Sequence, residues 1–532
     1  MCSGPPSYSK GEDKPPVDLV ADADFPELEA GVTEWSRDGR LLAVVCSDGV
    51  EIVDTNTNAM IGKVPAPGAR GLHFSPLCSY LLTWQPYVKA TDGSKAPGNL
   101  VVWRTATWEE EMRVIQKQFR KASWPSLQWS CDELIAARAL DNDIQIYHGQ
   151  HMDQGVISRI SCPKLGTFSI GPGGAPYCLA TFVPELKGKP GRVSLWHYPA
   201  VDTPVASRSS FNAQEASFSW SPDGKAVLYL TSTDVDTTGL SYYGSTSLSL
   251  MHADGQFDCV VNPPKEGAVH DFGWHPGAKG KFVVVAGTMP SQATLYNAKG
   301  EPTFNFGNAH RNTLCWSPHG RFLCLAGLGN LAGGMDFWDV NKLKKMGSTT
   351  SHCAVSYGWS PDSRYFMTAT CAPRMNVDNN VKVFRYDGSG PVVNRPVEVL
   401  LDAVWRPAAK GEYPDRPASP GRRSVGGQGG EGNSDKAGEG GSKGVYRPPN
   451  ATGALSGLMR AAREGDSSGP KRLSSLDASR SSATYVPGMG RAPGGGAGGK
   501  ASKEAKKKAG WRACCVADVW ACLGGGGGGG GG

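Results

Sequence analysis

The chain has 532 residues, of which 39% are hydrophobic, and its formal net charge is +6. It holds no apolar run long enough to span a membrane, and its first residues, MCSGPPSYSKGEDKPP, lack the apolar stretch of a signal peptide. Its fourteen cysteines form neither a disulfide framework nor two Cys-x-x-Cys pairs for zinc. These features exclude membrane and disulfide-rich classes, and we expect a reduced, cytoplasmic protein with no membrane partner.

An aromatic residue followed by a turn resembling Ser-Pro-Asp-Gly recurs through the first 405 residues. Successive copies lie 39 to 55 residues apart, room for four short strands and a hairpin, so the repeat predicts the blades of a β-propeller. The Pro or the Asp-Gly pair suits a tight turn, and the aromatic ring suits the space between blades. The nine anchors are Trp35, Phe74, Trp129, Phe168, Trp220, Trp274, Trp316, Trp359 and Trp405.

A second signature follows about 20 residues after most anchors, as a strand of alternating polar and apolar residues. The eight segments that fit are 50–54, 99–103, 143–147, 192–196, 246–250, 293–297, 335–339 and 381–388. No ninth segment follows Trp405, so we predict an all-β, nine-bladed β-propeller over residues 33–409 with an incomplete last blade. A propeller closes to remove its sheet edges. The N-terminal segment 1–32 offers a candidate ring-closing strand at 17–21, VDLVA.

The composition changes at residue 410. Residues 410–532 contain 32 of the 70 glycines and few aliphatic residues, so they cannot bury enough apolar surface to offset the entropy of ordering. This segment has 19 Lys and Arg against 10 Asp and Glu, a net charge of +9. Because the whole chain carries +6, the first 409 residues carry −3. We predict a slightly acidic propeller followed by a disordered, Gly-rich basic tail.

Three polar segments inside the propeller are richer than a blade needs. They are 231–244, 327–340 and 368–381. Each follows the second strand of its blade, so we expect all three near one face. One interpretation is turn chemistry, in which Asp, Asn and Thr side chains cap exposed backbone in long loops. The other is a recognition surface, in which Arg374, Tyr242 and Tyr243 are candidate RNA contacts.

The tail holds a dense basic run, KEAKKKAGWR, at 503–512. Its cationic side chains are able to neutralise several phosphates of an RNA. The alternatives are a solvated low-complexity segment or a localisation-like patch. The candidate RNA-binding residues here are Lys503, Lys506, Lys507, Lys508 and Arg512.

No catalytic motif stands out in the sequence. None of the Gly-Lys pairs is followed by the Ser or Thr of a phosphate-binding loop. A Gly-x-Ser-x-Gly string at 440–444 lies in the glycine-rich tail, where no strand–turn–helix is predicted. We therefore expect a protein that is not an enzyme, with no catalytic residue, cofactor, metal or small-molecule substrate.

Several longer strings resemble the eukaryotic translation initiation factor 2A family. They are LLTWQPY (81–87), KATDGSKAPGNLVVW (89–103), STDVDTTGLSYYG (232–244), FNFGNAHRN (304–312), GLGNLAGGMDFWDV (327–340), TATCAPRMNV (368–377) and GVYRPP (444–449). The resemblance runs in order from about Trp35 to Pro449. It departs at both ends, since the family has an extra strand-forming segment before the Gly-Pro-Pro at 4–6 and a longer charged, helix-forming segment at its end.

The resemblance implies a nine-bladed propeller and a cytoplasmic factor that associates with the small ribosomal subunit. It also implies that the factor promotes binding of initiator methionyl-tRNA without GTP hydrolysis, with mRNA as a further partner. The alternative is a propeller scaffold resembling the b subunit of initiation factor three. That protein carries an RNA-recognition domain before its ring, whereas no aromatic string of that kind precedes Trp35. A propeller hydrolase would need an α/β catalytic domain that the sequence does not show.

Overall fold

Eight four-stranded antiparallel sheets make up the fold in a computed structural model, which describes residues 25–26, 31–89, 96–119, 123–233, 244–277, 280–372 and 374–415. In every sheet the four strands pair in chain order, so each sheet is a meander built from neighbouring residues. We number the sheets blades 1 to 8 along the chain.

The strands of the first four blades are β1 (Thr33–Trp35), β2 (Leu41–Val45), β3 (Val50–Asp54) and β4 (Ala59–Val64); β5 (Gly71–Phe74), β6 (Tyr80–Trp84), β7 (Leu100–Arg104) and β8 (Glu110–Val114); β9 (Leu127–Trp129), β10 (Ile135–Ala139), β11 (Asp143–His148) and β12 (Val156–Ser161); and β13 (Thr167–Ile170), β14 (Tyr177–Val183), β15 (Gly191–Tyr198) and β16 (Ala206–Ser210). One 3-10 turn, η2 (Met152–Gln154), lies between β11 and β12.

The strands of the last four blades are β17 (Glu215–Trp220), β18 (Ala226–Thr233), β19 (Ser245–His252) and β20 (Asp258–Val261); β21 (Val269–Trp274), β22 (Phe282–Ala286), β23 (Ser291–Tyr296) and β24 (Pro302–Ala309); β25 (Thr313–Trp316), β26 (Phe322–Ala326), β27 (Gly334–Asp339) and β28 (Lys344–Thr350); and β29 (Ser356–Trp359), β30 (Tyr365–Thr370), β31 (Asn380–Arg385) and β32 (Val393–Pro396). Each of the eight segments with the second signature forms the third strand of a blade, which confirms those predictions.

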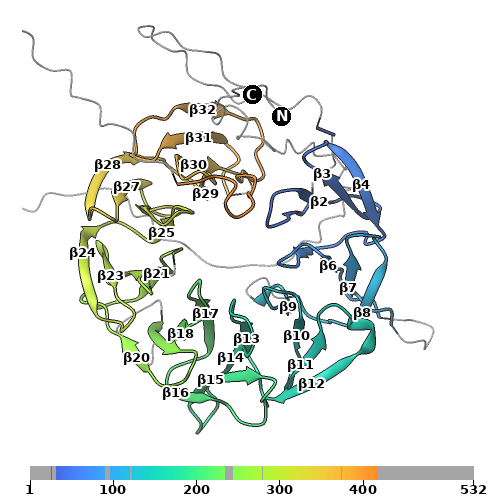
Figure 1. The fold of residues 1–532 in the computed structure, drawn as a ribbon. Coiled ribbons are helices and arrows are strands. Elements are labelled where there is room, and N and C mark those ends of the chain that lie inside the picture. The colour runs from blue at the N-terminus through green and yellow to red at the C-terminus, as the bar shows by residue number, and fades with distance from the viewer. Residues whose placement is uncertain are drawn as a thin grey trace, which may run out of the picture. The chain divides into compact units, whose positions relative to one another are not determined.

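The blades follow one another around a ring, with the first strand of each toward the centre and the fourth at the periphery (Figure 1). The apolar core is divided among the seams between neighbouring blades. Seven clusters of buried side chains each join two consecutive blades, from blades 1 and 2 to blades 7 and 8. A repeat fold of this kind avoids the size limit of a single core because each blade packs on its neighbours.

In four blades the turn after the anchor is built from its own serine and aspartate side chains. In blade 1 the Ser36 hydroxyl donates to Asp38 at 2.6 Å and accepts from the Leu41 N–H at 2.7 Å. Gly39 adopts a φ of +71°, which favours glycine, so the turn reverses the chain into β2. The same serine–aspartate bond recurs after the anchors of blades 3, 5 and 8.

The prediction of nine blades is wrong, because the described residues form eight. Trp405 repeats the contact of an anchor, since its indole Nε1 donates to the carbonyl of Gly358 in β29 at 2.9 Å. However, residues 397–415 form no strand, and Pro407 has no N–H for a sheet ladder. The anchor therefore marks a contact with the preceding blade without requiring a sheet of its own.

Residues 400–407 fill the seam between blade 8 and blade 1. Leu400 and Ala403 are buried in the cluster of blade 8. On the other side, Arg406 Nε donates to the carbonyl of Gly39 in blade 1 at 2.8 Å. The candidate closing strand at 17–21 lies outside the described residues, as do residues 416–532 of the tail predicted at 410–532.

Candidate functional site

Two of the three polar segments meet on one face of the ring. The β26–β27 connection (327–333) and the β30–β31 connection (371–379) belong to adjacent blades, and we call them the rim loops. Arg374 Nη2 donates to the side-chain oxygen of Asn330 across them. The Gly329 N–H also donates to the carbonyl of Ala354 at 3.2 Å, which holds the first loop against the start of blade 8.

The rim loops are braced by two amide side chains, of which Asn379 is buried and Asn312 half-buried. Asn312 donates to the Leu328 carbonyl at 2.9 Å and accepts from the Leu328 N–H at 3.0 Å. Asn379 donates to the Met375 carbonyl at 2.7 Å and accepts from the Leu400 N–H at 2.9 Å. These bonds are the turn chemistry that the sequence offered as one interpretation, and they give the loops fixed positions.

Arg374 is the predicted site residue that the structure describes, and it is exposed on its rim loop. Its guanidinium is held by Asn330 while facing solvent, so it is available to an anionic partner. Tyr242 and Tyr243 lie outside the described residues. The same holds for the tail candidates Lys503, Lys506, Lys507, Lys508 and Arg512, so those assignments stay predictions.

A buried ion pair lies beneath the first rim loop. The Arg311 side chain is 5% exposed and pairs with Asp336 in β27, which also pairs with Lys345 at 2.6 Å. Burial alone would raise the pKa of Asp336, but hydrogen bonds from Lys345 and Ser348 and the charge of Arg311 hold it below its usual value. Asp336 is therefore an ionised carboxylate at neutral pH that fixes blade 7 to the preceding connection.

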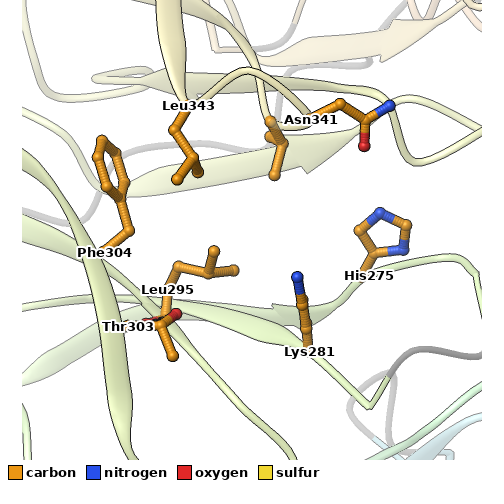
Figure 2. A pocket seen from close by; sticks show the side chains of 8 residues that line it. His275, Lys281, Leu295, Thr303, Phe304, Asn341 and Leu343 are labelled. Atoms are coloured by element: carbon orange, nitrogen blue, oxygen red, sulfur yellow. Dashed lines mark hydrogen bonds between the residues drawn. The ribbon is translucent and has the colours of Figure 1, made fainter.

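A pocket of about 250 Å³ lies between blades 6 and 7, on the face of the ring opposite the rim loops (Figure 2). Leu343 lies on one side of the hollow, with Leu295 and Thr303 on the other, and Phe304 at one end. Lys281 and His275 reach the polar end. We call this the blade 6–7 pocket, and it is lined by His275, Lys281, Leu295, Thr303, Phe304, Val340, Asn341 and Leu343.

Two polar side chains of the blade 6–7 pocket already form hydrogen bonds within the protein. His275 is buried, accepts from the Gly277 N–H through Nδ1 at 3.0 Å and packs 4.9 Å from the Trp316 ring. The Thr303 hydroxyl donates to the Leu295 carbonyl at 3.0 Å. Lys281 is exposed, so its ammonium is the cationic group that a ligand in the pocket would meet.

The sequence did not point to this pocket. The residues that line it come from two blades and lie up to about 68 positions apart in the sequence. The stretch from Asn341 to Lys345 has the composition of an ordinary polar turn. A run of lysines around one leucine in that turn was the available signal.

The described residues contain no group of three or more His, Cys, Asp or Glu side chains that could hold a metal ion. The ten cysteines among these residues form no disulfide, and burial raises the pKa of Cys178 to about 12, which disfavours a reactive thiolate there. Among the helices of this same part of the chain, none has the length and apolar character to cross a membrane. What these surfaces offer chemically is recognition through cations and apolar walls.

The family model and the sequence relatives described below are all translation initiation factors. A family model described as eukaryotic translation initiation factor eIF2A matches residues 208–402. The eukaryotic translation initiation factor 2A of Dictyostelium discoideum is 37% identical over 377 residues, which cover 70% of this chain and 60% of that protein. Its counterpart in Caenorhabditis elegans is 30% identical over 389 residues, covering 72% and 67%. The match to the Dictyostelium protein thus spans less than two thirds of its length.

Two further similarities concern the alternative and the fold. The b subunit of eukaryotic translation initiation factor 3 from Xenopus laevis is 27% identical over 382 residues, covering 70% of this chain and 53% of that protein. A solved structure titled as a crystal structure of the eukaryotic initiation factor is 31% identical, with a TM-score of 0.65. It covers 73% of this chain and 94% of its own.

Proposed function

Because the chain belongs to the eukaryotic translation initiation factor 2A family, we propose that it is a cytoplasmic translation initiation factor that associates with the small ribosomal subunit. In this proposal it promotes binding of initiator methionyl-tRNA without hydrolysing GTP, and it contacts mRNA. The observation that carries the proposal is the identity of 30 to 37% with members of this family over nearly the whole ring.

The architecture supports a division of labour between the ring and the tail. The ring holds its loops in fixed positions through amide side chains and a buried ion pair, as a docking platform requires. The tail carries a net charge of +9, which suits phosphate contacts that carry little sequence information. We propose that the ring supplies specificity and that the tail adds salt-sensitive affinity.

The second candidate function is a propeller scaffold of a larger initiation complex. It is favoured by the 27% identity to a b subunit of initiation factor three. That similarity is lower than the similarity to the initiation factor 2A proteins, so we rank the scaffold second.

Co-sedimentation with purified small ribosomal subunits tests the proposal directly. We expect the full chain, and the chain ending at residue 409, to sediment with the subunit, and the full chain to increase retention of initiator methionyl-tRNA on it. A factor that leaves initiator tRNA retention unchanged would contradict the proposal. Association with other initiation factors but not with the ribosome would favour the scaffold.

A first prediction concerns the basic run of the tail. Replacing Lys503, Lys506, Lys507 and Lys508 with Ala should flatten the slope of log affinity for tRNA against log salt by up to about 3, at roughly 0.7 per phosphate contact. Replacing Lys436 and Lys443 with Ala, elsewhere in the tail, should change the slope much less. Preference for initiator over elongator tRNA should be unchanged, and its loss would contradict the assignment of specificity to the ring.

A further inference from the structure

The blade 6–7 pocket differs from the matching seam between blades 1 and 2. There, Trp108 occupies the turn between the third and fourth strands of blade 2 and lies against Gly62 of β4, so tightly that a Cβ on the glycine would meet the indole. Leu343 occupies the same position in blade 7, with a φ of +50° against +60° for Trp108. Facing Leu343 is Phe304 of β24, and this pair leaves a hollow of about 250 Å³.

The size and walls of the pocket limit what it accepts. Sites for drug-sized ligands enclose about 300–1,000 Å³, so this pocket suits a single side chain. Leu295 and Val340 are 3% and 8% exposed and form a closed floor, whereas Leu343 is 41% exposed and forms an open wall. When an apolar group fills a hollow beside an exposed aliphatic side chain, apolar surface is removed from water, and this favours binding.

The rim of the pocket is basic although the first 409 residues carry a net charge of −3. Lys281 lines the pocket, and Lys342 and Lys344 flank its lining residue Leu343 along the chain. All three lysines are exposed and form no ion pair with any residue in the described ranges. By contrast, nearby Arg321 is paired with Asp339 at 3.1 Å. An apolar pocket with cations on its rim is complementary to an apolar side chain flanked by carboxylates.

We propose that the blade 6–7 pocket binds a segment of a partner protein in which one large apolar side chain is flanked by acidic residues. The apolar side chain fills the hollow between Leu295 and Leu343, and the flanking carboxylates face Lys281, Lys342 and Lys344. This interaction goes beyond the proposed function and does not depend on it, since ribosome sedimentation can fail while peptide binding stays intact.

An RNA strand fits the pocket less well than a protein segment. Single-stranded RNA sites combine cations with aromatic faces on which bases stack. Here the walls are mainly aliphatic, and the Phe304 ring packs edge-on against Phe306 and Trp338 at centroid distances of 5.0 and 6.2 Å. The Thr303 hydroxyl, which could read a base edge, is already donated to the Leu295 carbonyl.

The test uses the full chain and a fluorescent peptide, acetyl-Glu-Asp-Glu-Leu-Glu-Asp-Glu, followed by fluorescence anisotropy. We expect saturable binding that weakens about tenfold in the double variant Lys342→Glu and Lys344→Glu, because two rim attractions become repulsions. The matched control is Lys187→Glu with Lys189→Glu, which reverses two exposed lysines at the same spacing in the β14–β15 connection of blade 4. This control should bind like the parent.

Two further measurements separate the pocket from general charge attraction. A peptide with Ala in place of Leu should bind several-fold more weakly, and the variant Leu343→Ser should reduce that difference, because the hydrophobic gain scales with the apolar area buried. A 12-nucleotide uridine RNA should not displace the peptide. The proposal is overturned if the parent shows no saturable binding, if both double variants lose affinity equally, or if the RNA displaces the peptide.

Discussion

At the scale of single residues, the tryptophan anchors serve both packing and polar bonding. Three successive indoles donate to the first strand of the preceding blade: Trp274 to the Ser219 carbonyl, Trp316 to Gly273 and Trp359 to Cys315, at 2.8, 3.2 and 2.9 Å. A buried indole needs such a partner for its N–H. Each of these three anchors therefore links two neighbouring blades, which is a physical reason for Trp at these positions.

A second prediction follows for Trp359, which is 6% exposed and packs against Phe337 and Phe366 at 5.8 and 5.2 Å. Trp359→Ala should lower the free energy of unfolding by about 3–5 kcal/mol because it leaves a cavity. Trp359→Phe keeps most of the packing and should cost less. Urea unfolding checks both, and Phe211→Ala, at a side chain 73% exposed, is the control expected to change little.

The Arg311–Asp336 pair shows how a charged group is kept in the interior. The Arg311 atoms Nε and Nη1 are buried without an acceptor among the described residues, so Asp336 supplies the compensating charge. Removing one member of a buried pair leaves the other charge uncompensated, which typically costs about 3–5 kcal/mol.

A third prediction concerns the pH dependence of this pair. Because the folded state lowers the pKa of Asp336, its contribution to stability is complete above the unfolded value of about 3.9 and is lost as pH falls through the lower folded value. Asp336→Asn should therefore melt well below the parent at pH 7, and the difference should shrink below about pH 4. Melting temperatures measured from pH 3 to 7 check this. A difference that stays constant over the range would show that the charge is not involved.

At the scale of elements, the strands were predictable because blade-forming signals are local. Each third strand alternates polar and apolar residues, and four of the anchor turns carry their own serine and aspartate, as in 36–38 and 221–223. These patterns need no information from distant residues, so all eight third strands and the positions of the first eight anchors emerged from the sequence. Reliance on local signals also explains why the predicted number of blades was wrong. Trp405 carries the local sequence signature of an anchor, but residues 397–415 form no strand.

The candidate surfaces were less predictable than the strands. The expectation that the polar segments lie near one face followed from their positions after second strands. The contact between Arg374 and Asn330 agrees with it for two of the three, whereas residues 234–243 of the other lie outside the described residues. The blade 6–7 pocket depends instead on how Phe304 of one blade faces Leu343 of the next. Such a juxtaposition is set by the register of two sheets, which single-sequence periodicity does not contain.

A fourth prediction tests the bracing of the rim loops. Asn379→Ala removes the donor to Met375 and the acceptor for the Leu400 N–H, so it should lower stability by about 1–3 kcal/mol by leaving buried backbone groups unpaired. Hydrogen exchange should quicken at Leu400 and in the loop 374–379. Asn376→Ala, at an exposed position of the same loop, is the matched control. Equal effects of the two variants would contradict the bracing role.

At the scale of the whole ring, the seam between blades 8 and 1 is closed differently from the others. The other seven seams join two complete sheets, whereas this one contains the strandless residues 400–407. Leu400 supplies the buried apolar group on the blade 8 side, and Arg406 bonds to Gly39 on the blade 1 side. Further along, His319 Nε2 lies 2.7 Å from the Tyr413 carbonyl, which ties the end of this segment to blade 7.

This closure leads to a fifth prediction. A chain ending at Asp415 keeps residues 400–407 and should melt close to the full chain, whereas a chain ending at Pro396 loses Leu400, Trp405 and Arg406. Burial of one leucine alone is worth about 1.5–3 kcal/mol, so the shorter chain should have a clearly lower melting temperature. Its exposed seam should also show in hydrogen exchange, with faster exchange in β1 and β29 than in β13 and β17 on the far side of the ring. If the two truncated chains melt together, the strandless segment does not close the ring, and blades 8 and 1 must hold each other without it.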